Sequence, residues 1–84
     1  MNNYRDKLLA FDPDYFDWWD AGEWISKDDA AYHLTTRVFD KGGHRDPAPE
    51  YAAVRETIFQ ETEKAFPELG QAVRDNWIAG RHDT

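Results

Sequence analysis

The sequence contains no cysteine, one serine and no long apolar run. Without cysteine, disulfide bridges, thiol nucleophiles and thiolate metal sites are excluded. No stretch approaches the roughly 20 apolar residues that a membrane span requires. The N-terminal residues MNNYRDKLLAF also lack the basic and then apolar pattern of a secretion signal. We therefore expect a cytoplasmic protein with no membrane partner.

Basic side chains are scarce as well. Ten Lys and Arg face 17 Asp and Glu, for a net charge of −7. Such a chain is repelled by nucleic acids at long range, so we expect a basic protein partner and no direct contact with nucleic acid. The 84 residues suffice for one small domain, and four Trp, four Tyr and five Phe can supply its core.

The apolar residues recur at helical spacing throughout, and no segment shows the alternation of a strand. The sequence predicts an all-α fold, a compact bundle of four or five short helices in a single domain covering 1–84. A loop at 41–49 and a polar tail at 80–84 complete the prediction. The expected helical segments are 3–11, 13–21, 26–40, 49–66 and 67–79.

Capping residues set these boundaries. Asn3 and Ser26 can each accept a hydrogen bond from a free N–H group of a first helical turn. Asp12 can do the same before a proline, which is tolerated in the first turn because it has no N–H to leave unpaired. Gly22 supplies a left-handed stop, and Gly42-Gly43 ends the segment that begins at Ser26.

Catalytic chemistry finds little support. Ser26, the one serine, is predicted to cap a helix, which occupies its hydroxyl group and argues against a serine hydrolase. The histidines, His33, His44 and His82, lack the close spacing that builds a helical metal site. We therefore expect no catalytic residue, no metal and no cofactor, and a protein that is not an enzyme.

Residues 25–34, Ile-Ser-Lys-Asp-Asp-Ala-Ala-Tyr-His-Leu, resemble the first helix of excisionase-like and MerR-like helix-turn-helix domains. The resemblance implies a DNA-binding module. The chain departs from that pattern after Leu34, because residues 35–39 continue the helix where those domains make a tight turn. Only Arg37 and Lys41 nearby could neutralise phosphates, so DNA binding is the least favoured of the functions that we consider.

Acidic residues are concentrated in one stretch. Residues 12–29 hold seven acids and a single base, Lys27. On the predicted helix 13–21 the acids share one arc and the aromatic residues the opposite half. The acids of that arc are Asp14, Asp17 and Asp20, and the aromatic residues are Tyr15, Phe16, Trp18 and Trp19.

Part of this charge suits helix N-termini, but Asp17, Asp20 and Glu23 would lie toward a C-terminus, where the helix dipole disfavours anions. Trp18 and Trp24 exceed what so small a core can bury, and exposed Trp beside charge is typical of interface anchors. A solvated helix face over an aromatic core remains the other interpretation. The predicted partner-binding residues are Asp14, Asp17, Trp18, Asp20, Glu23 and Trp24.

The sequence thus favours a stoichiometric inhibitor that blocks a basic nucleic-acid-binding surface by placing carboxylates where phosphates would lie. The protein is similar in size and charge to the small acidic anti-restriction and anti-CRISPR proteins of mobile elements. This analogy rests on size and charge alone. The alternative is a small adaptor, antitoxin or subunit that pairs through apolar helix faces, with self-association left open.

Overall fold

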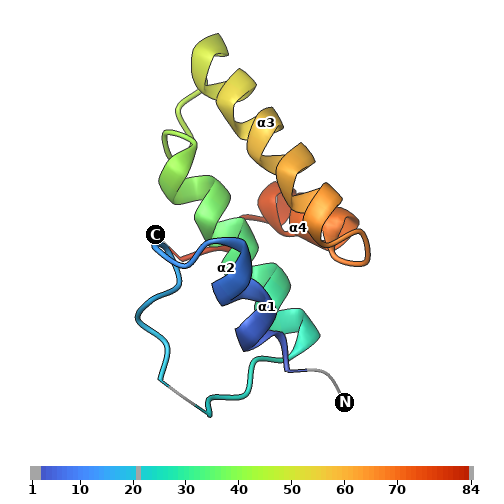
Figure 1. Ribbon diagram of the computed structural model, residues 1–84. Helices are drawn as coiled ribbons and strands as arrows, with labels where there is room; N and C mark the ends of the chain where they lie inside the picture. The colour runs from blue at the N-terminus through green and yellow to red at the C-terminus, as the bar shows by residue number, and fades with distance from the viewer. Residues whose placement is uncertain (1–2, 21, 84) are drawn as a thin grey trace. The chain divides into compact units, whose positions relative to one another are not determined.

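The computed structural model describes residues 3–20 and 22–83, so Ala21 and Thr84, the last residues of two predicted segments, lie outside it. The described residues form four helices and no strand, which confirms the all-α prediction (Figure 1). The helices are α1 (Tyr4–Phe11), α2 (Lys27–Lys41), α3 (Pro49–Ala65) and α4 (Gly70–Ala79). The chain divides into two compact units, and the first ends at Ala30 and the second begins at Ala31, within α2.

Helix α1 opens the first unit as its capping residue predicts. The Asn3 side-chain oxygen accepts a hydrogen bond from the Arg5 N–H group at 3.1 Å. Tyr4 and Leu8, one turn apart, form its buried side. The helix ends where the Asp12 N–H group donates to the Leu8 carbonyl at 3.0 Å.

The predicted helix at 13–21 is wrong, because residues 13–19 form turns and bends and Asp20 has no regular structure. The capping chemistry is present: Asp12 accepts from the Tyr15 N–H group at 3.3 Å through its side chain and from the Phe16 N–H group at 3.1 Å through its carbonyl. The turn that Asp12 caps does not continue into a helix. Asp and aromatic residues are weak helix formers, and Asp17 and Asp20 would meet an unfavourable dipole at the helix end.

Helix α2 begins as predicted, with the Ser26 hydroxyl oxygen accepting from the Asp29 N–H group at 3.1 Å. It ends in a Schellman motif: the His44 N–H group donates to the Phe39 carbonyl at 2.9 Å, and Gly43 takes a left-handed φ of 75°. A side chain at Gly43 would also run into the Tyr51 ring. The position therefore requires glycine for both its conformation and its space.

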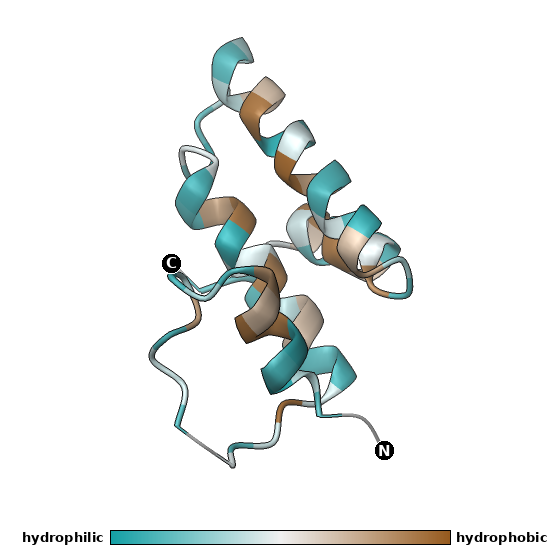
Figure 2. Cartoon of the chain, in the orientation of Figure 1, coloured by the Kyte–Doolittle hydropathy of each residue, from teal (hydrophilic) through white to brown (hydrophobic). Residues whose placement is uncertain are grey.

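In the second unit α3 and α4 lie side by side (Figure 1). Pro49 occupies the first turn of α3 as predicted, and α4 ends at Gly80 with a left-handed φ of 72°. Gly70 allows close approach, since an added Cβ would lie 2.6 Å from the Glu63 Cγ atom. Figure 2 shows apolar and polar bands succeeding each other along α3. The buried apolar residues of this unit are Ala31, Leu34, Val38, Ile58, Phe59, Phe66, Leu69 and Val73.

Arg74 links α4 to α3 electrostatically. Its guanidinium group donates to a Glu56 oxygen at 2.8 Å and to a Glu63 oxygen at 2.7 Å, and it lies over the Phe59 ring at 4.7 Å. The hydrogen bond from Arg74 lowers the pKa of Glu56 below its ordinary value. The pair therefore stabilises the fold above the ordinary glutamate pKa, and this contribution is lost as the pH falls through the lowered value.

We expect Glu56→Gln to reduce the loss of unfolding free energy that the protein shows between about pH 5 and pH 3. The difference should stay below about 1 kcal/mol, because the pair is partly exposed to solvent. Urea unfolding at both pH values measures it. Glu68→Gln is the control, since Glu68 is exposed and accepts no side-chain hydrogen bond in the second unit. Equal acid sensitivity of the two variants would contradict the assignment.

Arg55 organises the loop between α2 and α3. Its guanidinium group donates to the carbonyl oxygens of Gly42 at 2.9 Å, His44 at 3.2 Å and Asp46 at 2.9 Å. One side chain on α3 thus satisfies three loop carbonyls that have no helix partner.

Arg55→Ala is expected to lower the unfolding free energy by about 2 kcal/mol, because hydrogen bonds from a charged donor are lost and the loop carbonyls must be solvated anew. Denaturant unfolding measures the loss, and hydrogen exchange should accelerate at residues 42–46. Arg81→Ala provides the comparison, as the exposed Arg81 side chain has no hydrogen-bond partner in the described second unit. A similar effect from both variants would rule out a specific role for Arg55.

Candidate acidic and aromatic binding segment

Residues 12–24, here called the acidic segment, leave the end of α1 and return to its start (Figure 1). Asn3 closes this excursion: its amide nitrogen donates to the Glu23 carbonyl at 3.0 Å, and its side-chain oxygen accepts from the Ile25 N–H group at 3.0 Å. The Tyr4 N–H group donates to the Ile25 carbonyl at 3.0 Å. The residue that caps α1 therefore also holds the returning chain.

Asn3→Ala is expected to destabilise the first unit by about 2 kcal/mol, because it removes a helix cap together with both side-chain bonds to the returning chain. Chemical denaturation measures the change. Asn3→Asp is the matched control: it keeps the acceptor for Arg5 and Ile25 and loses only the donor to Glu23. Unchanged stability in Asn3→Ala would show that the closure of the segment does not depend on this side chain.

Two buried rings anchor the acidic segment. Phe16 is fully buried and Trp19 nearly so, and their rings stack at a centroid distance of 4.9 Å with planes 20° apart. Tyr15 meets the Phe16 ring edge-on at 4.8 Å. Stacked and edge-on aromatic pairs stabilise beyond the area they bury, so these rings fix the middle of a segment that has no regular structure.

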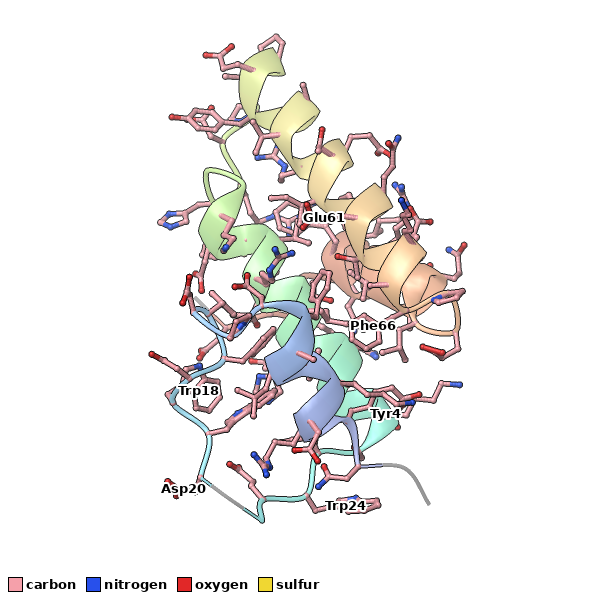
Figure 3. All side chains as sticks on the ribbon, in the orientation of Figure 1. Tyr4, Trp18, Asp20, Trp24, Glu61 and Phe66 are labelled. Atoms are coloured by element: carbon pink, nitrogen blue, oxygen red, sulfur yellow. The ribbon has the colours of Figure 1, made fainter. Side chains whose placement is uncertain are left out.

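The residues predicted to contact a partner are all exposed. Trp18 has 57 % of its surface exposed and Trp24 49 %, whereas a core indole would be covered. Figure 3 shows the labelled Trp18, Asp20 and Trp24 at separate points along the segment, and polar colours prevail there in Figure 2. The exposed carboxylates are those of Asp14, Asp17, Asp20 and Glu23.

The predicted separation of acids from aromatic residues is only half right. Along 16–20 the side chains are buried, exposed, exposed, buried and exposed, so Trp18 joins Asp17 and Asp20 on the outside. The helical arc that was expected to gather the acids does not exist, since the segment is not helical. The acids instead project from a loop in which Phe16 and Trp19 are buried and Trp18 is exposed.

Few basic side chains of the first unit are present to neutralise the carboxylates of the acidic segment. The first unit carries eight acidic and three basic side chains, a net charge of −5. Arg5 pairs with Asp6 at 3.1 Å, and Lys7 lies over the Tyr4 ring at 5.0 Å. Among residues 3–20 and 22–30, no side chain pairs with the four exposed carboxylates of the segment, which leaves them available to external cations.

A second cluster, in the second unit, was not foreseen from the sequence. His44 stacks on Phe39 at 4.5 Å, and His82 stacks on Phe39 at 4.4 Å and on Trp77 at 5.4 Å. Arg45 lies over the Trp77 ring at 4.1 Å. The sequence predicts His82 to lie in a polar tail, yet only 8 % of its surface is exposed. No local pattern signals contacts between residues so far apart in the chain.

Other site classes gain no support from the described residues. Nowhere between residues 3 and 20 or between 22 and 83 do three histidine or acidic side chains gather so that they could hold a metal ion. None of the four helices is long and apolar enough to cross a membrane. Comparison with protein-family models, with curated proteins and with solved structures gives no match to this chain.

Proposed function

We propose that the protein is a non-enzymatic cytoplasmic inhibitor whose acidic segment binds the basic nucleic-acid-binding surface of another protein and blocks it. The observation that carries the proposal is the pair of half-exposed indoles, Trp18 and Trp24, among four carboxylates that no base of the first unit neutralises. Carboxylates pair with Arg and Lys, and an indole face attracts the same cations while it supplies apolar contact.

The spacing of the acids supports a groove as the target. Acids stand at every third position from 14 to 23. The turns at residues 13–19 keep successive charges closer than the roughly 10 Å that three extended residues would span, so the four charges lie within a length on which one DNA strand would place several phosphates. A groove that binds phosphates is lined with Lys and Arg side chains along such a length. The four carboxylates can neutralise some of these positive charges.

The net charge of −7 supports the same assignment by directing the protein away from nucleic acid and toward the surface that binds it. Electrostatic attraction of this kind mainly accelerates association, whereas buried aromatic anchors slow dissociation. Trp18 and Trp24 fit the second role and the carboxylates the first.

Salt dependence tests the proposal. The protein, immobilised on a resin, captures partners from a lysate of its own organism at about 50 and 200 mM salt, and affinities of the retained partner are then measured with purified components. Binding through charge should weaken at least tenfold over this range, as the contacts lie at an exposed surface. Affinity that stays constant would contradict binding through the acidic segment.

Pairing through apolar helix faces is the second candidate, and exposed apolar side chains favour it. Tyr51 and Val54 are exposed on α3, and Ile78 on α4 has 79 % of its surface exposed. Such pairing, with another chain or a second copy, depends little on salt. Ile78→Asp would abolish it and leave binding through the acidic segment unchanged, so one variant separates the two candidates.

A further inference from the structure

The His82 side chain is buried although its neighbours Arg81 and Asp83 are exposed. Its ring lies nearly parallel to that of Phe39, with planes 23° apart, and to that of Trp77, with planes 26° apart. In the described second unit Phe39 and Trp77 have no ring contact with each other, so the imidazole lies between them. The three rings come from α2, α4 and the residues after α4.

Both ring nitrogens of His82 also have hydrogen-bond partners. The Arg45 Nη1 atom lies 3.1 Å from the His82 Nε2 atom, and since a guanidinium group only donates, this nitrogen accepts. The other nitrogen, Nδ1, then carries the proton and donates to the Asp83 carbonyl at 3.3 Å. Arg45 itself is fixed, because it also donates to the Trp77 carbonyl at 3.0 Å.

We propose that Phe39, Trp77 and Arg45 form a binding slot for a flat, uncharged nitrogen heteroaromatic ring of the imidazole or purine type, and that His82 is its intramolecular occupant. Stacking on aromatic rings together with an arginine donor to an in-plane ring nitrogen is the chemistry by which proteins hold single bases. This slot belongs to the second unit and is independent of the proposed function of the acidic segment.

The occupant is tethered by few other contacts. Beyond the ring, the Gly80 N–H group donates to the Trp77 carbonyl at 3.1 Å and the Arg81 N–H group to the Asn76 carbonyl at 2.7 Å, both at the end of α4. After the ring, the Asp83 N–H group donates to the Thr36 hydroxyl oxygen at 3.0 Å. Withdrawal of His82 therefore needs no helix to unfold. A tethered occupant competes with any free ligand, so the intact chain should bind a free ring more weakly than a chain without the imidazole.

His82→Gly tests the slot with free imidazole as the probe, at about pH 8, where imidazole is mostly uncharged. We expect imidazole to raise the melting temperature of His82→Gly and to shift the Trp77 indole NMR signal, with an affinity at least about tenfold higher than for the unaltered chain. Arg45→Ala in the same background should weaken binding by about tenfold. Tetrahydrofuran, a five-membered ring with an acceptor atom but no flat π face, should have no effect.

Absence of an imidazole-dependent shift at Trp77 in His82→Gly would overturn the proposal, as would an equal response to tetrahydrofuran or equal affinity for the unaltered chain. If His82→Gly does not fold alone, recovery of its helical circular dichroism by imidazole becomes the readout. His82→Gln, whose amide oxygen can still accept from Arg45, is the folded reference. Failure of imidazole to restore His82→Gly while His82→Gln is folded would also overturn it.

Discussion

Lysine at both Asp17 and Asp20 is expected to weaken partner binding by at least about a hundredfold at 50 mM salt. Each substitution removes an attraction to a basic surface and adds a repulsion, and close charge pairs across interfaces couple by more than about 1.5 kcal/mol each. Both side chains are exposed and have no partner in the first unit, so the fold should tolerate the change. Affinity of the purified variant for the captured partner measures the effect.

The matched control is Glu50→Lys/Glu68→Lys, which changes the net charge by the same amount from exposed positions of the second unit. Its affinity for the partner should fall only slightly, because the change in net charge acts on the partner at long range. The salt dependence of its binding should resemble that of the unaltered protein. Equal weakening by both pairs would mean that overall charge alone drives binding. Unchanged binding in Asp17→Lys/Asp20→Lys would mean that the acidic segment is only a solvated surface.

Phe16→Ala is expected to lower the unfolding free energy by about 3–5 kcal/mol, the range for truncation of a fully buried aromatic ring. Phe16 has no exposed surface and stacks on Trp19, so the cavity would open at the anchor of the acidic segment. For a chain of this size such a loss is a large part of the total stability. Denaturant unfolding, followed by far-ultraviolet circular dichroism, measures it.

Trp18→Ala, two positions along, should separate binding from folding. Because 57 % of Trp18 is exposed, its truncation should cost stability about 1 kcal/mol or less while it weakens partner binding at least tenfold. A variant set in which Trp18→Ala destabilises as much as Phe16→Ala would contradict the assignment of one ring to the core and the other to the interface.

Local chemistry accounts for what could be predicted from the sequence. Asn3 and Ser26 cap α1 and α2 as expected, and Pro49 lies in the first turn of α3, because each role depends only on residues a turn away. The exposure of Trp18 and Trp24 was predicted from a count of indoles against the size of the core, and the structure confirms it.

What escaped prediction depends on distant partners or on a balance of weak preferences. The Asp12 cap exists, yet the predicted helix after it does not form, since Phe16 and Trp19 bury their rings from a turn. The second role of Asn3, which holds residues 23–25, and the enclosure of His82 join positions far apart in the chain. Helical periodicity carries no information on such pairs.

Competition with duplex DNA tests the central claim most directly. The purified partner is loaded with fluorescently labelled protein, and DNA that the partner binds is titrated into the complex at constant salt. If the acidic segment occupies the nucleic-acid-binding surface, DNA should displace the labelled protein completely, and the midpoint should rise in proportion to the protein concentration. A stable ternary complex of partner, protein and DNA would contradict the account.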